Sequence, residues 1–301
     1  MLLSSDSHVM LSLLALLLVL EPSAQGAQWD IYDLVDSLGC KDFVGALQST
    51  GPMYVLSDNS TGPYTVFAPS DDAFNKLPPN IAAIFNYGNW EYMHEIITFH
   101  ITYGNKSVAD FHNEARLRTW QGQDLRVNVY SNTSGGAAMV TAEGARIVKS
   151  AVATNGIVHV VDRVLYNFPQ VSADRYVHEQ RNMTTLDMVV QIAGLQKTLR
   201  EDNITLFAPQ DSVFKKMVGF MNQTLSNTTR ITDMVKNHMV NSTLYSASLV
   251  DGSVLTNSLG QHIAVKNNGS TITLNGVPVL RSDVSVTNGV VHTIGGLLFP
   301  V

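Results

Sequence analysis

The chain has 301 residues, of which 45% are hydrophobic and 15% are charged. Such proportions are typical of globular proteins, and the length allows two domains of roughly 100 to 150 residues each. The formal net charge of −6 excludes the basic surface that nucleic-acid binding requires.

Residues 1–26 are expected to be a secretory signal peptide. Leu11–Leu20 is a short apolar run, and the helix-breaking Pro22 and the small residue Ala24 follow it. The run is too short to span a bilayer core of about 30 Å as a helix. We expect cleavage between Ala24 and Gln28. No later stretch has the roughly 18 apolar residues of a spanning helix, so we expect a secreted protein of the extracellular space or matrix, without a membrane anchor.

Secretion is also indicated by Asn-X-Ser/Thr sequons, which are acceptor sites for N-glycosylation. Nine asparagines begin such a sequon: Asn59, Asn105, Asn132, Asn182, Asn203, Asn222, Asn227, Asn241 and Asn268. Chance would give roughly three in a chain with this asparagine content, so the excess predicts a glycoprotein. Asn203 directly precedes a predicted strand, and its modification is left open.

Three blocks of sequence occur twice in the same order. The blocks are Tyr64–Phe74 with Ile204–Phe214, Ile97–His100 with Val235–His238, and Thr154–His159 with Thr287–His292. The copies are 140, 138 and 133 residues apart. Similar but unequal spacings indicate one domain that was duplicated and then altered in its loops.

The repeat divides the chain into four parts: a signal peptide (1–26), domain 1 (27–169), a short linker (170–182) and domain 2 (183–301). Each domain is expected to begin with an amphipathic helix, because apolar residues are spaced i, i+3, i+4 and i+7. These residues are Ile31, Leu34, Val35 and Leu38 in domain 1, and Leu186, Val189, Val190 and Ala193 in domain 2.

The Phe-Ala-Pro block that follows is expected to form a strand that ends at Pro69, since proline cannot donate within a sheet. A short helix should come next, capped by Ser70 or Asp71 in domain 1 and by Asp211 in domain 2. We interpret Asp71 and Asp72 as caps rather than as a catalytic pair, because domain 2 keeps only one of these acids.

A further helix is expected to lead into the repeated histidines, His100 and His238. Strand signals dominate the rest of each domain: alternating apolar residues, and Asn-Gly turns at 155–156, 275–276 and 288–289. Helices come first and strands cluster last, so the predicted fold class is α+β. We expect each domain to be a mainly antiparallel, β-sandwich-like wedge with several short α-helices.

These blocks resemble the fasciclin-I domain family in order and spacing. The blocks are the Phe-Ala-Pro strand, the histidine after the central helix, and the terminal Asn-Gly-(Ile/Val)-Val-His strand. The size and the signal peptide are similar to those of small secreted two-domain fasciclin proteins of marine invertebrates such as cnidarians. The resemblance implies an extracellular adhesion module without enzymatic activity, which acts between cells or between host and symbiont. Its implied partners are integrin-like receptors or matrix components.

The family's adhesion motif is usually Tyr-His, and this chain departs from it in both domains. The corresponding residues are Phe99, His100, Asn237 and His238. Phe99 keeps the aromatic ring but lacks the hydroxyl, whose hydrogen bond is worth on the order of 1 kcal/mol. We expect any cell-binding surface to centre on Phe99 and His100, with the neighbouring apolar Ile97 and Ile101.

A search for catalytic and metal-binding motifs predicts no enzyme, no cofactor and no metal. The chain has no Gly-X-Ser-X-Gly elbow and no His-Glu-X-X-His helix. His100 with His159, and His238 with His292, could approach one another, but a zinc site takes three or four protein ligands and no Cys or repeated carboxylate supplies the rest. We expect buried imidazoles whose N–H groups donate to backbone carbonyls.

Other interpretations stay open. Cys40 is the only cysteine, so it is either a buried small hydrophobe or the site of an intermolecular disulfide that links a dimer. A structural matrix protein, associated with a skeleton or with polysaccharide, would bind through its glycans and its mild acidity. A carrier of apolar ligands would need an internal cavity.

Overall fold

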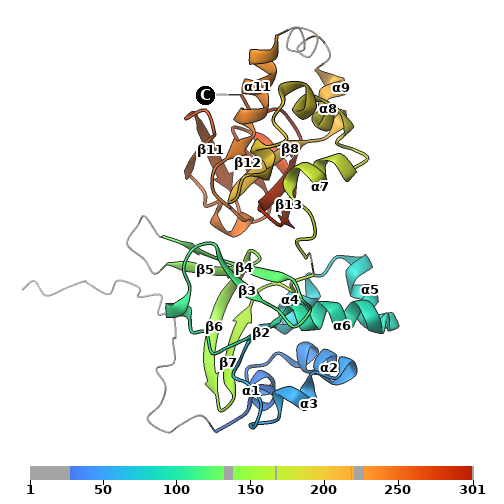
Figure 1. Ribbon diagram of the computed structural model, residues 1–301, viewed down its shortest axis with the longest axis vertical. Coiled ribbons are helices and arrows are strands. Elements are labelled where there is room, and N and C mark those ends of the chain that lie inside the picture. The colour runs from blue at the N-terminus through green and yellow to red at the C-terminus, as the bar shows by residue number, and fades with distance from the viewer. Residues whose placement is uncertain (1–27, 132–137, 167, 218, 220–226, 300–301) are drawn as a thin grey trace, which may run out of the picture.

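The computed structural model describes residues 28–131, 138–166, 168–217, 219 and 227–299. The predicted signal peptide and the sequons at Asn132 and Asn222 lie outside the described residues. Figure 1 shows two domains stacked along the longest axis, with domain 1 below domain 2. Within the described ranges, none of the helices is long and apolar enough to cross a membrane.

Domain 1 begins with helices and ends with strands, as predicted. Its helices are α1 (Ile31–Ser37), α2 (Lys41–Thr50), α3 (Met53–Leu56), α4 (Asp71–Asn75), α5 (Pro79–Tyr87), α6 (Trp90–Phe99) and the 3-10 turn η1 (Val108–Asp110). Its strands are β1 (Tyr64–Pro69), β2 (Ile101–Tyr103), β3 (Ala115–Arg118), β4 (Asp124–Tyr130), β5 (Met139–Ala142), β6 (Ala145–Ala153) and β7 (Gly156–Val161). The strands form one sheet in the order β2-β1-β7-β6-β5-β4-β3.

Domain 2 repeats this arrangement. Its helices are α7 (Ala173–Glu179), α8 (Thr184–Ala193), η2 (Thr198–Arg200), α9 (Asp211–Lys216), α11 (Thr228–Asn237) and η3 (Ser246–Ser248). Its strands are β8 (Ile204–Pro209), β9 (Met239–Val240), β10 (Val254–Thr256), β11 (His262–Asn267), β12 (Ile272–Leu274), β13 (Val277–Val286) and β14 (Gly289–Ile294). The sheet order is β10-β11-β12-β13-β14-β8-β9, so the α+β prediction for both domains is confirmed.

Each sheet is antiparallel except for one central parallel pair, β1 with β7 and β8 with β14. These pairs explain the glycines of the repeated Asn-Gly blocks. A Cβ atom on Gly156 would lie 2.0 Å from the carbonyl oxygen of Tyr64, and one on Gly289 would lie 1.9 Å from that of Ile204. The backbones approach so closely that no side chain fits between them.

The Phe-Ala-Pro strand is buried on both faces because it separates two cores. Val66 and Ala68 face the core between the sheet and the first helices, whereas Phe67 faces a second core inside the curved sheet. In domain 2, Leu206 likewise faces the core beside the first helices, and Phe207 faces the second core. This alternation follows from the two-residue period of a strand and accounts for the nearly continuous apolar sequence of the block.

The first helices of the two domains are α1 and α7, which differs from the sequence-based pairing of α1 with α8. Asn155 and Asn288 reveal the true correspondence. Asn155 Oδ1 accepts from the Ile31 backbone N–H at 2.9 Å, and Asn288 Oδ1 accepts from that of Ala173 at 2.9 Å. The repeated asparagines thus fix the start of each domain, a role beyond the predicted turns.

The predicted linker, 170–182, contains helix α7. Ala173 and Val177 of this helix are 0% and 1% exposed and belong to the main core of domain 2. The segment is therefore largely part of domain 2, and the connection between the domains is shorter than the sequence suggested. The helix escaped prediction because its apolar face has only two fully buried positions.

Asp71 and Asp211 cap helices other than the ones predicted. Asp71 Oδ1 accepts from the Asp42 N–H in the first turn of α2 at 3.0 Å. Asp211 Oδ1 accepts from the Thr185 N–H in the first turn of α8 at 2.8 Å. The helices that begin at these acids, α4 and α9, have no side-chain cap bond. Each carboxylate therefore joins the end of the Phe-Ala-Pro strand to an earlier helix.

This geometry predicts unequal effects for two adjacent acids. Asp71→Ala should destabilise domain 1 by about 1 kcal/mol, because the α2 N-terminus loses its acceptor. Asp72→Ala should change the stability little, since this exposed side chain lies outside the contact. Urea unfolding followed by tryptophan fluorescence measures both variants; equal losses of stability would contradict the assignment.

Candidate interaction surfaces

The predicted adhesion motif lies inside the protein. Phe99 and His100 are 0% exposed, as are the flanking Ile97 and Ile101, and His238 is 2% exposed. Asn237 is only partly exposed. The side chains at Phe99 and His100 therefore cannot contact a receptor in the folded domain, and an adhesive surface must be sought elsewhere.

His100 connects the central helix to the chain segment that follows the last strand. Its Nε2 accepts from the Leu165 backbone N–H at 3.0 Å, so Nδ1 carries the proton and donates to the Ile96 carbonyl at 2.7 Å. His238 makes the same two bonds in domain 2, to Leu298 and Met234, at 2.9 and 2.7 Å. These contacts match the expected buried imidazole. Burial lowers the pKa of both histidines to about 4.

His159 and His292 are also fully engaged. Nε2 of His159 is 2.8 Å from the Lys106 carbonyl oxygen and its Nδ1 is 2.7 Å from Ser150 Oγ. His292 Nε2 is 2.8 Å from the Leu244 carbonyl oxygen, and its Nδ1 accepts from a backbone N–H. Both ring nitrogens of each repeated histidine thus have partners. Among the described residues, no group of three or more His, Cys, Asp or Glu side chains could hold a metal ion.

Cys40 is 0% exposed, and burial raises the pKa of its thiol to about 11. Its Sγ points to the Ala68 carbonyl oxygen at 4.0 Å. A buried neutral thiol is a poor nucleophile. The structure therefore favours the buried-hydrophobe interpretation, because a disulfide to another chain would require α2 to move away from the core.

The helical side of domain 1 carries exposed aromatic side chains beside a groove. The groove has a volume of about 600 Å³ and lies between α2, α4, α5 and α6. Tyr87 and Trp90 are 87% and 55% exposed; Tyr87 directly follows the groove residue Asn86, and Trp90 begins α6. Trp90 is fixed in place, since Nε1 donates to the Ser49 carbonyl at 3.1 Å and the ring stacks on His94. We call this surface, formed by Ser49, Asn86, Tyr87, Trp90 and His94, the helical face.

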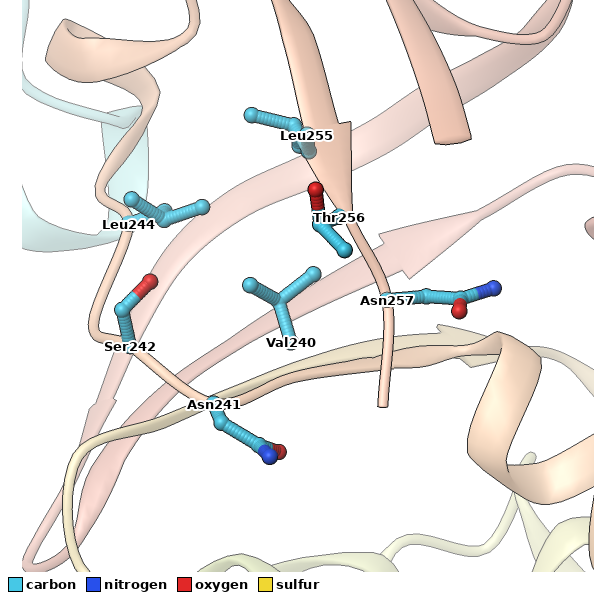
Figure 2. A pocket seen from close by; sticks show the side chains of 7 residues that line it. All are labelled: Val240, Asn241, Ser242, Leu244, Leu255, Thr256 and Asn257. Carbon is cyan, nitrogen blue, oxygen red and sulfur yellow. The ribbon is translucent and has the colours of Figure 1, made fainter. Parts of the chain in front are cut away.

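A second hollow, of about 420 Å³, lies between β9 and β10 of domain 2 (Figure 2). Val240, Ser242 and Thr256 line its centre, whereas the amide of Asn241 lies at its edge. Asn241 Oδ1 accepts from Ser258 Oγ at 2.7 Å. Because a predicted glycan acceptor stands at its edge, this hollow is a weaker candidate for protein recognition than the helical face.

An extensive polar contact joins the two domains. Arg126, on β4 of domain 1, is 2% exposed. Its guanidinium pairs with Glu114 of the same domain and donates to the Thr287 carbonyl of domain 2 at 3.0 Å. It also contacts Thr243 Oγ1 at 3.3 Å. One side chain thereby connects the sheet of domain 1 to two loops of domain 2.

Tyr245 of domain 2 lies against the hairpin turn between β5 and β6. It is 0% exposed, and its hydroxyl donates to Glu143 Oε2 at 2.8 Å. Burial, followed by the charge of Glu143, raises the pKa of Tyr245 well above its ordinary value, so the hydroxyl keeps its proton. A Cβ atom on Gly144 would lie 2.4 Å from the Tyr245 ring. Glycine is needed there both for this contact and for its φ of +78°.

Arg163 of domain 1 and Asp283 of domain 2 form an ion pair across the interface at 2.5 Å. Burial alone would raise the pKa of Asp283, but Arg163 and His292 hold it below its usual value. Tyr130 adds a hydroxyl that donates to the Thr243 carbonyl at 3.1 Å. The buried carboxylate of Asp283 is therefore paired, since an unpaired buried charge is costly.

Charged residues of this interface are not repeated in the two domains, and this difference is visible in the sequence. Matching strand registers place Ala264 where domain 1 has Arg126, and Asn275 where it has Glu143. Charged residues that occur in one copy alone are not required by the fold, so they indicate a specific contact of that copy.

The described sequons differ in accessibility. The exposed acceptors are Asn59, Asn105, Asn182, Asn227, Asn241 and Asn268. Asn203 is half-buried, and its Oδ1 is 3.4 Å from Arg126 Nη1 at the domain interface. Glycosylation at all of these positions remains a prediction.

Comparison with known proteins gives concordant matches. A family model described as the fasciclin domain matches residues 38–167 and 181–300. Transforming growth factor-beta-induced protein ig-h3 from Sus scrofa is 29% identical over 79% of this chain and 35% of its own length. Human periostin is 27% identical over 79% of this chain and 28% of its own length. The chain thus spans about a third of the length of these relatives.

Among solved structures, a FAS1 domain pair from the insect cell adhesion molecule fasciclin I is 22% identical. The match between the two covers 88% of this chain and 98% of the fasciclin I chain, with a TM-score of 0.40. The family match includes both halves of the sequence repeat and both seven-stranded domains. The chain belongs to the fasciclin domain family, with two copies of the domain in tandem.

Proposed function

We propose that this protein is a secreted glycoprotein of the extracellular matrix or cell surface that mediates adhesion without enzymatic activity. Its partner would be an integrin-like receptor or a matrix component, in contacts between cells or between host and symbiont. Membership of the fasciclin family supports this function, as do relatives such as periostin that match both domains. The predicted signal peptide and sequons are consistent with the compartment.

The helical face of domain 1 is the surface that we assign to the receptor. This assignment replaces the buried Phe99-His100 motif. Tyr87 and Trp90 together expose aromatic area beside a groove, and aromatic residues of this kind dominate the binding energy of protein interfaces. Trp90 is held by Ser49 and His94 in the free protein, so little side-chain entropy is lost when a partner binds.

Attachment of cells to surfaces coated with the secreted protein tests this function. We expect attachment that is lost when divalent cations are chelated. Tyr87→Ser should raise the coating density for half-maximal attachment by a factor of about ten, which corresponds to about 1.4 kcal/mol. Tyr103→Ser is the matched control, because Tyr103 is another exposed tyrosine of domain 1, at 61% exposure, on the sheet edge.

Each outcome of this experiment has a defined meaning. Equal attachment by the two tyrosine variants would reject the helical face while leaving adhesion itself intact. An absence of attachment would favour the second candidate, a structural matrix protein without direct receptor binding. The exposed sequons around both domains favour that alternative, because glycans on them would cover much of the surface.

A further inference from the structure

Asn203 differs from the other described sequon asparagines in its surroundings. It directly precedes β8, has a left-handed backbone with φ of +61° and is half-buried. Its Oδ1 lies 3.4 Å from Nη1 of Arg126, and the Arg126 side chain is 2% exposed. The asparagine therefore closes one side of the buried guanidinium at the domain interface.

A glycan on Asn203 would start inside this contact. An N-linked sugar is attached to Nδ2, which is bonded to the same carbon as Oδ1. The first sugar would thus begin within a few ångströms of the Arg126 guanidinium, at the boundary between the two domains. Arg126 cannot withdraw while the domains stay docked, because it also bonds Thr243 and the Thr287 carbonyl of domain 2.

The folded domain 2 does not offer this sequon to a modifying enzyme. Thr205 provides the sequon hydroxyl and is 0% exposed. Its Oγ1 donates to the Ser242 carbonyl at 2.6 Å and accepts from the Leu244 N–H at 2.8 Å. Glycosylation must therefore occur before domain 2 folds. Asn203 therefore either carries a glycan or lacks one before the interface forms, since the interface forms only after both domains have folded.

We propose that glycosylation of Asn203 and docking of the two domains exclude each other. Occupancy of this one sequon divides the secreted protein into a docked form and an opened form. Domain 2 itself accommodates the glycan, because Asn203 belongs to a surface loop once domain 1 is displaced. This inference concerns the arrangement of the domains and does not depend on the adhesive function.

Glycopeptide mapping of size-separated protein tests the proposal. The full chain is secreted from eukaryotic cells, fractionated by hydrodynamic radius, and treated with peptide N-glycosidase in heavy-oxygen water to mark occupied asparagines. We expect the Asn203 glycan to be confined to the fraction with the larger radius. Asn203→Gln should yield the compact form alone, whereas Asn105→Gln, which removes an exposed acceptor of domain 1, should leave both forms present.

Two results would overturn the proposal. One is an Asn203 glycan in the compact fraction at the same occupancy as in the extended fraction. The other is an Asn203 that carries no glycan in any fraction, because this glycan could then not cause the difference between the compact and the extended form.

Discussion

Replacement of Arg126 by alanine is expected to uncouple the two domains. The variant leaves Glu114 and Glu143 without their shared cation and removes the donors to the Thr287 carbonyl. Loss of one partner from a buried ion pair costs about 3 to 5 kcal/mol, because the remaining charge stays in a dry environment. The protein can avoid most of this cost only by separating the domains and hydrating the carboxylates.

Chemical unfolding with two probes measures this effect. All three tryptophans, Trp29, Trp90 and Trp120, belong to domain 1, so their fluorescence reports that domain alone, whereas circular dichroism reports both. We expect coincident transitions for the natural sequence without glycans and separate transitions for Arg126→Ala without glycans. Arg116→Ala is the control, since exposed Arg116 lies opposite Arg126 in the β3–β4 ladder. Coincident transitions in both variants would contradict the proposed coupling.

Acid is expected to destabilise both domains well before their carboxylates titrate. Burial lowers the pKa of His100, His159 and His238 to about 4, compared with about 6.5 for an unfolded histidine. The unfolded state then binds protons that the folded state cannot. The full contribution of these neutral histidines to stability is therefore present above about pH 6.5. This contribution falls as the pH decreases and is lowest below about pH 4.

The expected loss is on the order of 2 kcal/mol per histidine at pH 5. His100 and His159 both lie in domain 1, so the combined effect is a large part of a typical domain stability of 5 to 15 kcal/mol, as an order of magnitude. Urea unfolding at pH 7 and pH 5, followed by tryptophan fluorescence, measures it. His112→Asn, which replaces an exposed histidine of domain 1, is the control variant. An equal midpoint at pH 7 and pH 5 would refute the account.

The features that could be predicted from the sequence are those that both domains share. The Phe-Ala-Pro strand, the buried histidines and the Asn-Gly blocks all serve the fold, and each appears twice. Their occurrence in both domains distinguishes these motifs from chance matches, and their local patterns are sufficient to assign strands and turns. The buried state of His100 followed from the same reasoning, whereas its adhesive role came only from family resemblance, and its burial rules out direct contact.

The features that could not be predicted depend on contacts between residues far apart in the chain. Asp71 caps a helix that begins 30 residues earlier, a pairing that no local pattern reveals. Arg126 would ordinarily be placed on the surface, since an isolated arginine is rarely buried. Its partners lie in loops of the other domain, and only the folded chain brings them together.

Small-angle X-ray scattering of the Asn203→Gln protein measures directly whether the two domains are docked in solution. This variant removes the glycan at the interface while the other sequons remain. We expect one scattering curve, independent of concentration, that the docked pair of Figure 1 reproduces. A curve that requires a mixture of separated domain positions would contradict the docked arrangement.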